Sequence, residues 1–279
     1  VDPNSEAVSA TRNFTFPYNP LDPNTNTGDA PVPGVQTYPG SAFQQGTVTQ
    51  LFYITNWFHD ETYRLGFTEG ARNFQHDNFS RGGIGGDRVR GEGQDSSGTN
   101  NANFSSGADG VRGRMQMYIF TAPNPDIDGN LDADVVIHEL THGLSNRLHG
   151  NSSGLQLDLA RGMGEGWSDF YALAMLSLPS DDPNGCYALG GYTGYIPTGN
   201  NYYFGIRRYP YSTDLTKSPL TFAHLSEQFL NGSIPRNPSF TSNGQLNPSE
   251  VHNQGEIWCA ALWEVRANLI AKHGFAVGN

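Results

Sequence analysis

Charged residues are scarce in this chain of 279 residues, at 15% of the total, and those of positive sign are the scarcer kind. Lysine and arginine number 16 against 27 aspartates and glutamates, which gives a formal net charge of −11. Nucleic acids and anionic membranes both call for a basic surface, so this balance argues against either partner. Long apolar runs are missing too, and none approaches the roughly 20 residues that span a bilayer.

Cysteine is nearly absent as well, since Cys186 and Cys259 are the only two. A pair of cysteines suits an oxidising compartment if they form a disulfide and a reducing one if they stay thiols, so both remain open. Glycine (34) and proline (17) are plentiful. With so few charges, this composition is typical of a loop-rich globular protein rather than a disordered one.

The clearest chemical signal is the stretch His138-Glu139-Leu140-Thr141-His142. Apolar residues recur around it at helical spacing: Ile137, Leu140, Leu144 and Leu148. This stripe predicts a helix that faces the core. His138 and His142 are one turn apart on the same face, where two imidazoles make half of a divalent-metal site, most often for zinc. Glu139 is placed to touch a metal-bound water rather than the metal.

A catalytic zinc site needs a third protein ligand, and Gly162-Met163-Gly164-Glu165-Gly166-Trp167-Ser168-Asp169 offers one. The following residues predict a helix that has Glu165 near its start and is stopped by Pro179. Glu165 and Asp169 are four apart and share one face. Glu165 can complete the ligand set, and Asp169 can accept the free ring N–H of a ligand histidine. The alternative is a chance pair of histidines, solvated or satisfied in the core.

These motifs resemble the fungalysin family of secreted zinc metallopeptidases, which is related to thermolysin and uses a glutamate as third zinc ligand. The resemblance rests on residues 138–142, on Gly143-Leu144-Ser145-Asn146-Arg147 and on residues 162–169, and it covers roughly residues 45–274. The metzincin pattern does not fit. It would have glycine at position 145 and histidine at position 148, where this chain has Ser145 and Leu148.

The resemblance implies an α+β fold with two lobes, an N-terminal lobe with an antiparallel sheet and a mainly helical C-terminal lobe, with zinc in the cleft. We expect an extended wrapping segment over residues 1–45, a sheet-containing lobe over 46–149 that ends in the zinc-binding helix, and a mainly helical lobe over 150–279. Family catalytic domains continue with more helices, so we expect the last lobe to be incomplete at its C-terminal end.

Local patterns place further elements. Spaced apolar residues predict an amphipathic helix over 46–66 with Gly66 as its cap, and alternation predicts a strand over 115–120. A short helix is predicted over 219–231, and a last helix runs from Glu250 to Gly274.

By the same resemblance the chain is a zinc-dependent endopeptidase. Zinc held by His138, His142 and Glu165 would keep a fourth position for a water that Glu139 activates by taking its proton. His252 resembles the family histidine that donates a hydrogen bond to the tetrahedral oxyanion. Taken alone, a histidine at the start of a helix is more often a surface or capping residue.

The chain departs from the family pattern at two positions. The tyrosine that shares the oxyanion role falls on Gln156, which can donate through its amide but cannot act as a phenol. The aspartate that orients the family histidine falls on Asn247, so either Glu250 replaces it or nothing does.

Further family features concern the substrate. Asn101-Ala102 matches a pair on the edge strand that hydrogen-bonds the substrate backbone, and such an edge can take an extended peptide as an added strand; an ordinary loop is the alternative. The stretch 205–212 resembles one that supplies an arginine to the substrate carbonyl, from either Arg207 or Arg208. The resemblance also implies secretion and an N-terminal propeptide that inhibits the precursor, and it leaves the oligomeric state open.

Carboxylates gather just before the metal-binding helix: Asp126, Asp128, Asp132 and Asp134. They suggest a Ca²⁺ site, but not an EF-hand, because the twelfth position is Ile137. Asp134 matches a calcium ligand of thermolysin, whereas the partner position of that site is Leu176 here. The alternative is that these groups cap the helix and complement its dipole.

Two other function classes stay open. A non-catalytic binding module stapled by zinc would close the metal with four protein ligands, and only three are visible. A zinc hydrolase acting on non-peptide substrates would have no use for the edge-strand pair Asn101-Ala102.

Overall fold

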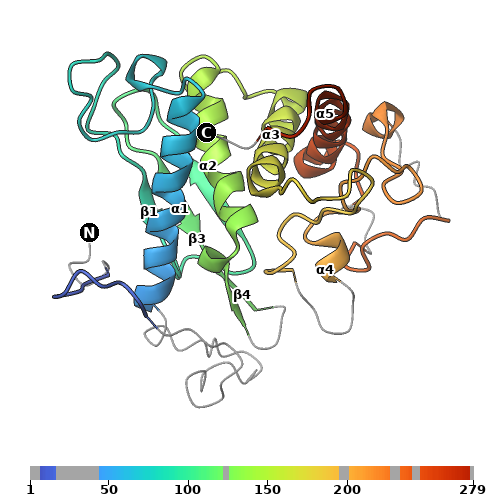
Figure 1. Ribbon diagram of the computed structural model, residues 1–279, viewed down its shortest axis with the longest axis horizontal. Helices are drawn as coiled ribbons and strands as arrows, with labels where there is room; N and C mark the ends of the chain where they lie inside the picture. Colours follow the sequence, from blue (N-terminus) through green and yellow to red (C-terminus); the bar gives the residue numbers. More distant parts are fainter. Residues whose placement is uncertain are drawn as a thin grey trace.

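Long helices and small sheets make up the chain, shown in Figure 1 as a computed structural model. It describes residues 7–16, 44–121, 126–194, 201–226, 233–240 and 246–276. In chain order the elements are α1 (Gln44–Arg64), the 3₁₀ helix η1 (Glu69–Ala71), β1 (Arg90–Glu92), β2 (Ala102–Ser105), β3 (Arg114–Met117), β4 (Ile119–Phe120), β5 (Ile127–Asp128), the 3₁₀ helix η2 (Gly129–Leu131), α2 (Ala133–Leu148), α3 (Asp158–Leu176), α4 (Asn201–Phe204), the 3₁₀ helix η3 (Phe222–Leu225) and α5 (Val251–His273). The α+β class is confirmed.

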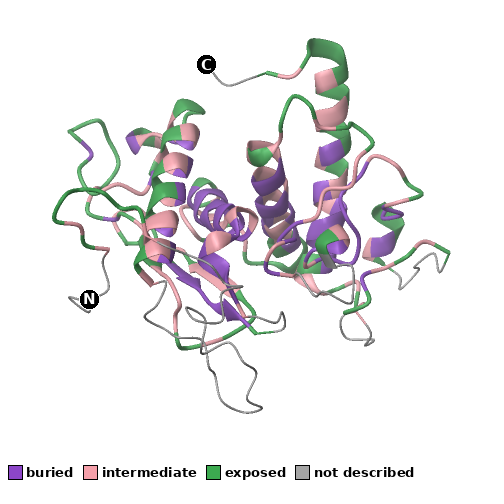
Figure 2. Ribbon diagram, turned by 60° about the horizontal axis from the view of Figure 1, so that its bottom comes forward, coloured by how far each residue is buried: buried purple, intermediate pink, exposed green. Residues whose placement is uncertain are grey.

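Helix α2, which carries the histidine motif, lies in the middle of the fold. It packs against α1 and the strands on one side and against α3 on the other, and α3 packs in turn against α5. Figures 1 and 2 show α1, α2 and the strands in one half and α3, α4 and α5 in the other. The exact division at residues 45 and 149 stays a prediction.

The larger sheet has the order β1-β3-β2 and is mixed rather than purely antiparallel. Strand β1 runs parallel to β3, with Arg90 opposite Arg114, whereas β2 runs antiparallel to it, with Ala102 opposite Met117. The strand predicted over 115–120 is present but broken at Tyr118, because Ile119 and Phe120 leave β3 to pair with β5. Because the order is β1-β3-β2, β2 is an edge strand within the described part of the chain.

The main core cluster extends from α1 and β3 through α2 to α3 and α5. Of the predicted stripe on α2, Ile137, Leu140 and Leu144 are buried, whereas Leu148 at the last residue of the helix is 54% exposed. Helix α1 ends at Arg64, and Gly66 just beyond it has a φ of +107°, the left-handed conformation expected of a C-terminal glycine. Of the helix predicted over 219–231, the described residues form only η3.

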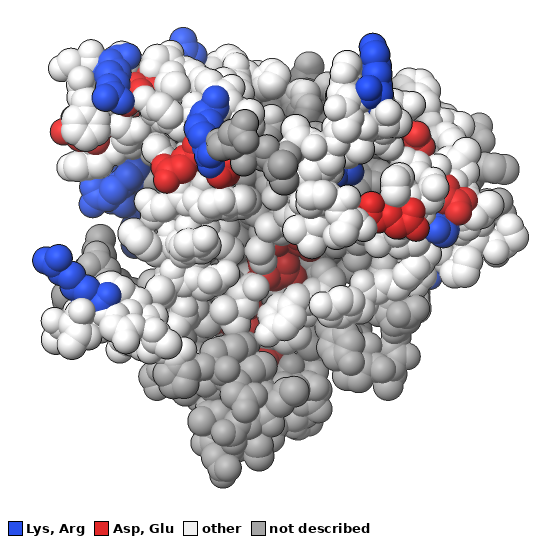
Figure 3. Space-filling model, viewed as in Figure 1, with Lys and Arg blue, Asp and Glu red and all other residues white. Residues whose placement is uncertain are grey.

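Three other features of the described residues bear on function. Cys186 and Cys259 are both free thiols, and Cys259 is fully buried. No helix that the structure describes is long and apolar enough to cross a membrane. On the face drawn in Figure 3, lysine and arginine side chains stand apart from one another, mostly toward the half that carries α1, and acidic atoms are visible near its middle.

Candidate metal centre

The side chains of His138, His142 and Glu165 converge on one point between α2 and α3. The Nε2 atoms of the two histidines lie 3.1 Å apart, and Glu165 Oε2 lies 3.2 Å from Nε2 of His138 and 3.3 Å from Nε2 of His142. Tetrahedral zinc with bonds of about 2.0–2.1 Å places its ligand atoms about 3.3–3.4 Å apart. The triangle therefore has the size that a zinc ion requires.

The chemistry of these three atoms also fits a cation. Glu165 Oε2 is buried and has no hydrogen-bond partner among the described residues. Burial would raise the pKa of Glu165, but the neighbouring histidines outweigh it and hold that pKa well below the usual glutamate value. An ionised carboxylate facing two ring nitrogens is a metal ligand set, and among the described residues it is the one such cluster of three or more His, Cys, Asp or Glu side chains.

Asp169 contacts the ring of His138, on the helix face that it shares with Glu165. Its Oδ1 lies 2.7 Å from Nδ1 of His138, and it is 1% exposed. Burial opposes ionisation of Asp169, yet Arg207 and the hydrogen bonds hold its pKa well below the usual value, so it only accepts. An Nδ1–H of His138 can therefore donate to Asp169, and a metal held by the cluster would take the lone pair of Nε2.

Glu139 lies beside this cluster without joining it. It is buried, and its Oε2 has no hydrogen-bond partner among the described residues. Burial raises the pKa of Glu139, against the opposing effect of the histidines. A carboxylate with a raised pKa and one free oxygen is suited to accept a proton from a group that enters the site.

His252 reaches the same point from the start of α5. Its Nε2 lies 3.4 Å from Glu165 Oε2, and its Nδ1 lies 2.7 Å from Glu250 Oε1. Burial opposes a charge on His252, but these two glutamates outweigh it and raise its pKa. Glu250 thus stands in the orienting position that the sequence left open, while Asn247 accepts from the backbone N–H of Ser249 in the turn before α5.

Close packing of glycines brings α3 and α5 together at this site. An added Cβ on Gly255 of α5 would lie 2.6 Å from the Cβ of Glu165 and 2.9 Å from the backbone nitrogen of Gly166. Gly162, one turn before Gly166, would collide in the same way with Gln254 of α5. Because the two backbones almost touch, Glu165 and His252 can face the same point.

The same packing explains a correction to the sequence-based boundaries. Helix α3 begins at Asp158, so Glu165 lies in its third turn rather than near its start. Glycines at 162, 164 and 166 lower helix propensity and predicted a later beginning. Contact of this segment with α5 overrides that weak preference.

We expect Gly255→Ala to push α3 and α5 apart. Overpacking of this kind costs about 1–3 kcal/mol, and the displaced helices would also weaken zinc binding. Thermal unfolding and a zinc titration measure the two effects. Gly164→Ala is the matched control, because its added Cβ would meet only Leu155 at 3.7 Å and the helix gains about 1 kcal/mol of propensity. Equal stability of the two variants would show that the crossing tolerates a methyl group.

The edge strand β2 is held against the metal-binding helix through Gly143. An added Cβ on Gly143 would lie 2.7 Å from the ring of Phe104, which is the third residue of β2. Ala102 is the first residue of this strand, and Asn101 is exposed just before it. The structure therefore places the predicted pair Asn101-Ala102 on an edge, next to the helix that bears both histidines.

Arg147 ties the end of α2 to the loops around the sheet. Its guanidinium is completely buried over the ring of Phe74, donates to Asp87 Oδ2 at 2.8 Å, and donates to the backbone carbonyls of Arg72, Gly107 and Val111. Bonds in so many directions fix the orientation of α2 and hence of the histidines upstream.

The structure separates the two candidate arginines. Arg207 lies beside the metal cluster, where its Nε and Nη2 both donate to Asp169 at 2.7 Å. Arg208 is paired instead with Glu256 of α5 and donates to the backbone carbonyl of Asn253, and it is 2% exposed. A buried salt bridge thus occupies each guanidinium, and which of the two arginines faces substrate stays a prediction.

Gln156 is not brought to the cluster by any contact of the described residues. It is exposed in the loop that precedes α3. Its role on the oxyanion stays a prediction.

The carboxylates before α2 accept hydrogen bonds from the helix start and from residues distant in the sequence. Asp128 accepts from the backbone N–H of Asn130, and Asp132 caps α2 through the N–H of Asp134 and accepts from the backbone and hydroxyl of Thr193. Asp134 accepts from the N–H of Gly190. These hydrogen bonds fit the capping alternative. Ca²⁺ at this place stays a prediction, and these aspartates do not form a cluster of three converging carboxylates among the described residues.

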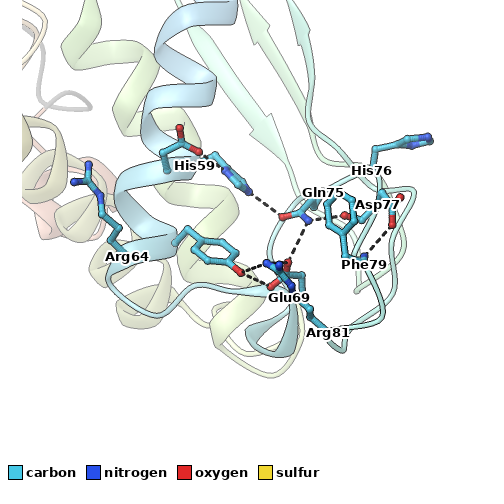
Figure 4. Close-up of a pocket in the computed structure, with 10 residues that line it drawn as sticks. His59, Arg64, Glu69, Gln75, His76, Asp77, Phe79 and Arg81 are labelled. Atoms are coloured by element: carbon cyan, nitrogen blue, oxygen red, sulfur yellow. Dashed lines mark hydrogen bonds and ion pairs between the residues drawn. The ribbon is translucent and has the colours of Figure 1, made fainter.

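A polar cavity of about 780 Å³ lies elsewhere, between the end of α1 and the loop after η1 (Figure 4). Its side chains bond mainly to one another. Tyr63 donates to Glu69 at 2.8 Å, Arg81 donates to Tyr63, and His59 Nε2 lies 3.1 Å from Gln75 Oε1. No residue of the metal cluster lines it, so the two sites are separate.

Comparison with known proteins decides the family. The sequence profile of the fungalysin metallopeptidases (M36) matches residues 2–278. The chain belongs to this family. The fungalysin chain is 47% identical over 239 residues to extracellular metalloproteinase 5 of Arthroderma gypseum and 46% identical over 242 residues to extracellular metalloproteinase MEP of Pyricularia oryzae. It is 41% identical over 274 residues to extracellular metalloproteinase mep of Aspergillus terreus.

These matches cover much of the fungalysin chain but a minor part of its relatives. They span 85%, 86% and 97% of this chain, and 33%, 34% and 37% of the three relatives. The chain thus spans about a third of the length of the curated relatives it matches.

Sequence reasoning missed two residues that shape this fungalysin centre. Tyr211, buried at 1% exposure, donates to Asp169 Oδ2, and Asn237 holds the backbone carbonyls of Gly205 and Arg207 at 2.9 Å. Neither lies in a periodic pattern. The glycine pair Gly162 and Gly166, spaced four apart, was the one available signal for a close helix crossing.

Proposed function

We propose that this chain is a zinc-dependent endopeptidase that acts outside the cell. The triangle of His138, His142 and Glu165, with the unpartnered carboxylate of Glu139 beside it, carries the proposal. Three protein ligands leave a fourth position for chemistry, whereas a zinc staple is closed by four. The names of the fungal relatives, extracellular metalloproteinases, support both the reaction and the location.

The residues of the centre have different roles in the proposed reaction. Zinc held here would lower the pKa of a water toward about 7 and polarise a substrate carbonyl. Glu139 would accept the proton of the attacking water on its free Oε2 and deliver it to the leaving amine. Asp169 keeps the proton of His138 on Nδ1, so that Nε2 remains a ligand atom.

His252 would donate from Nε2 to the oxyanion that forms on the substrate carbonyl. Its position 3.4 Å from Glu165 Oε2 supports this role, and Glu250 holds the ring through Nδ1. Donors set in place before the reaction stabilise the developing charge most effectively.

An extended peptide is the substrate that the edge strand supports. Backbone groups of Asn101 and Ala102 would hydrogen-bond the peptide as an added strand, close to α2. A hydrolase of non-peptide substrates gains nothing from such an edge. A propeptide that inhibits the precursor would use the same groups, an inference that rests on the family resemblance.

The proposal is tested by metal analysis together with hydrolysis of casein. We expect about one zinc per chain, cleavage within the casein chains, loss of cleavage with a zinc chelator, and its return on adding zinc. A chain that binds zinc but cleaves neither casein nor a set of labelled peptides would support the binding-module alternative. Cleavage of small esters alone would support the non-peptide alternative.

We expect His252→Ala to lower kcat and kcat/KM together by about 10²–10³-fold while zinc content stays unchanged. An oxyanion donor acts only once the tetrahedral species forms, so substrate binding is spared. Steady-state kinetics and metal analysis measure this. His273→Ala, at the other end of α5, is the control. If His252→Ala lowers the melting temperature but leaves kcat intact, the histidine is only a capping residue.

A further inference from the structure

The carboxylate of Asp169 is saturated with hydrogen-bond donors. An ionised carboxylate offers about four acceptor sites. Oδ1 receives His138 Nδ1 and Arg207 Nη2, and Oδ2 receives Arg207 Nε and the hydroxyl of Tyr211. With Asp169 only 1% exposed, water has no access to replace a lost donor. Each donor therefore restricts the rotation of the carboxylate and, through it, the ring of His138.

Tyr211 is itself held from several sides. Its backbone N–H donates to the carbonyl of Tyr187 at 2.8 Å, and its carbonyl accepts from the N–H of Tyr187 at 2.9 Å. The ring of Tyr187 packs against Trp263 of α5 at 5.2 Å, and Cys259 of the same helix contacts the Tyr211 side chain. The phenol therefore arrives at Asp169 from a rigid support.

We propose that Tyr211 is a positioning residue of the metal centre, which fixes Asp169 so that His138 presents Nε2 to zinc in one orientation. This inference rests on the proposed function. The phenol acts at the oxygen of Asp169 that His138 does not use, so Tyr211 adds to the hydrogen bond of His138 without competing with it. It also links the α5 side of the core to a ligand on α2.

The test is zinc affinity, measured by competition with a chromogenic chelator, in Tyr211→Phe and in wild type. We expect the loss of the hydroxyl to weaken zinc about tenfold, the lower end of the range for partners of a ligand histidine. The absorption bands of the cobalt(II)-substituted chain should shift, because they report the ligand geometry. Tyr209→Phe is the matched control, since Tyr209 is equally buried on the same segment but packs with Leu220 and Ile257.

A double-mutant cycle separates positioning from general stability. In an Asp169→Ala background, Tyr211→Phe should cause no further loss of zinc affinity, because its only route to the metal is gone. The inference is overturned if Tyr211→Phe binds zinc like wild type, if its loss persists without Asp169, or if Tyr209→Phe weakens zinc equally. A wild-type chain that binds no zinc at all would instead overturn the proposed function, and this inference with it.

Discussion

Glu139→Gln should keep its zinc and its fold and lose nearly all peptidase activity. The substituted side chain has the same size, and Glu139 is not among the three atoms that form the ligand triangle. An amide cannot accept the proton of an attacking water, and loss of a general base typically costs about 10²–10⁴-fold in rate. We therefore expect kcat to fall by at least about 10²-fold, with zinc content and melting temperature close to wild type.

Steady-state hydrolysis of a labelled peptide, with metal analysis on the same sample, measures this effect. Glu139→Asp is the informative companion, because it keeps a carboxylate at a shorter reach and should retain part of the activity. Loss of zinc from Glu139→Gln would mean that Glu139 is a ligand. Turnover near wild type would assign the base elsewhere, and His252 would be the next candidate because its Nε2 lies 3.4 Å from Glu165 Oε2.

The parts of the centre that the sequence predicted are those set by local helical geometry. His138 and His142 face one way because they are one turn apart, and the same holds for Glu165 and Asp169. The buried stripe on α2 depends on the same period, and it fails only at Leu148, where the helix leaves the core. Helical periodicity alone therefore predicts that the two histidines share one face of their helix and that Glu165 and Asp169 share one face of theirs.

The meeting of these halves depends on contacts distant in sequence. Only the crossing of α3 and α5 at Gly255 shows that Glu165 and His252 point to one place, and it also extends α3 back to Asp158. Arg207 and Arg208 are neighbours with identical chemistry, and only their partners, Asp169 and Glu256, tell them apart. No local pattern encodes such partners.

Composition was equally ambiguous for the carboxylates before α2. A cluster of aspartates suits calcium and suits a helix N-terminus, because both supply positive charge. Asp132 is occupied by the N–H of Asp134 and by Thr193, sixty-one residues further along the chain. The loop that brings Thr193 to this place has no signature in the sequence.

Glu165→Ala should abolish activity by removing the metal. Structural zinc sites bind with about 10–16 kcal/mol over four ligands, so one ligand contributes roughly 3 kcal/mol, or more than about hundredfold in affinity. The remaining His138 and His142 would form only half of a site, and the carboxylate that balances the charge of the ion would be gone. Added zinc should not restore hydrolysis, because the geometry of the fourth position depends on all three ligands.

Zinc titration and peptide hydrolysis on Glu165→Ala test this, with Asp169→Ala as the graded comparison. Asp169 touches His138 but not the metal position, so its loss should weaken zinc by only about 10–100-fold and leave activity that saturating zinc recovers. The decisive result is which of the two variants loses more zinc affinity. If Glu165→Ala binds zinc as tightly as wild type, the triangle seen between α2 and α3 is not the metal site; if Asp169→Ala is the more damaging, the main support of the site is the orientation of His138 rather than the third ligand.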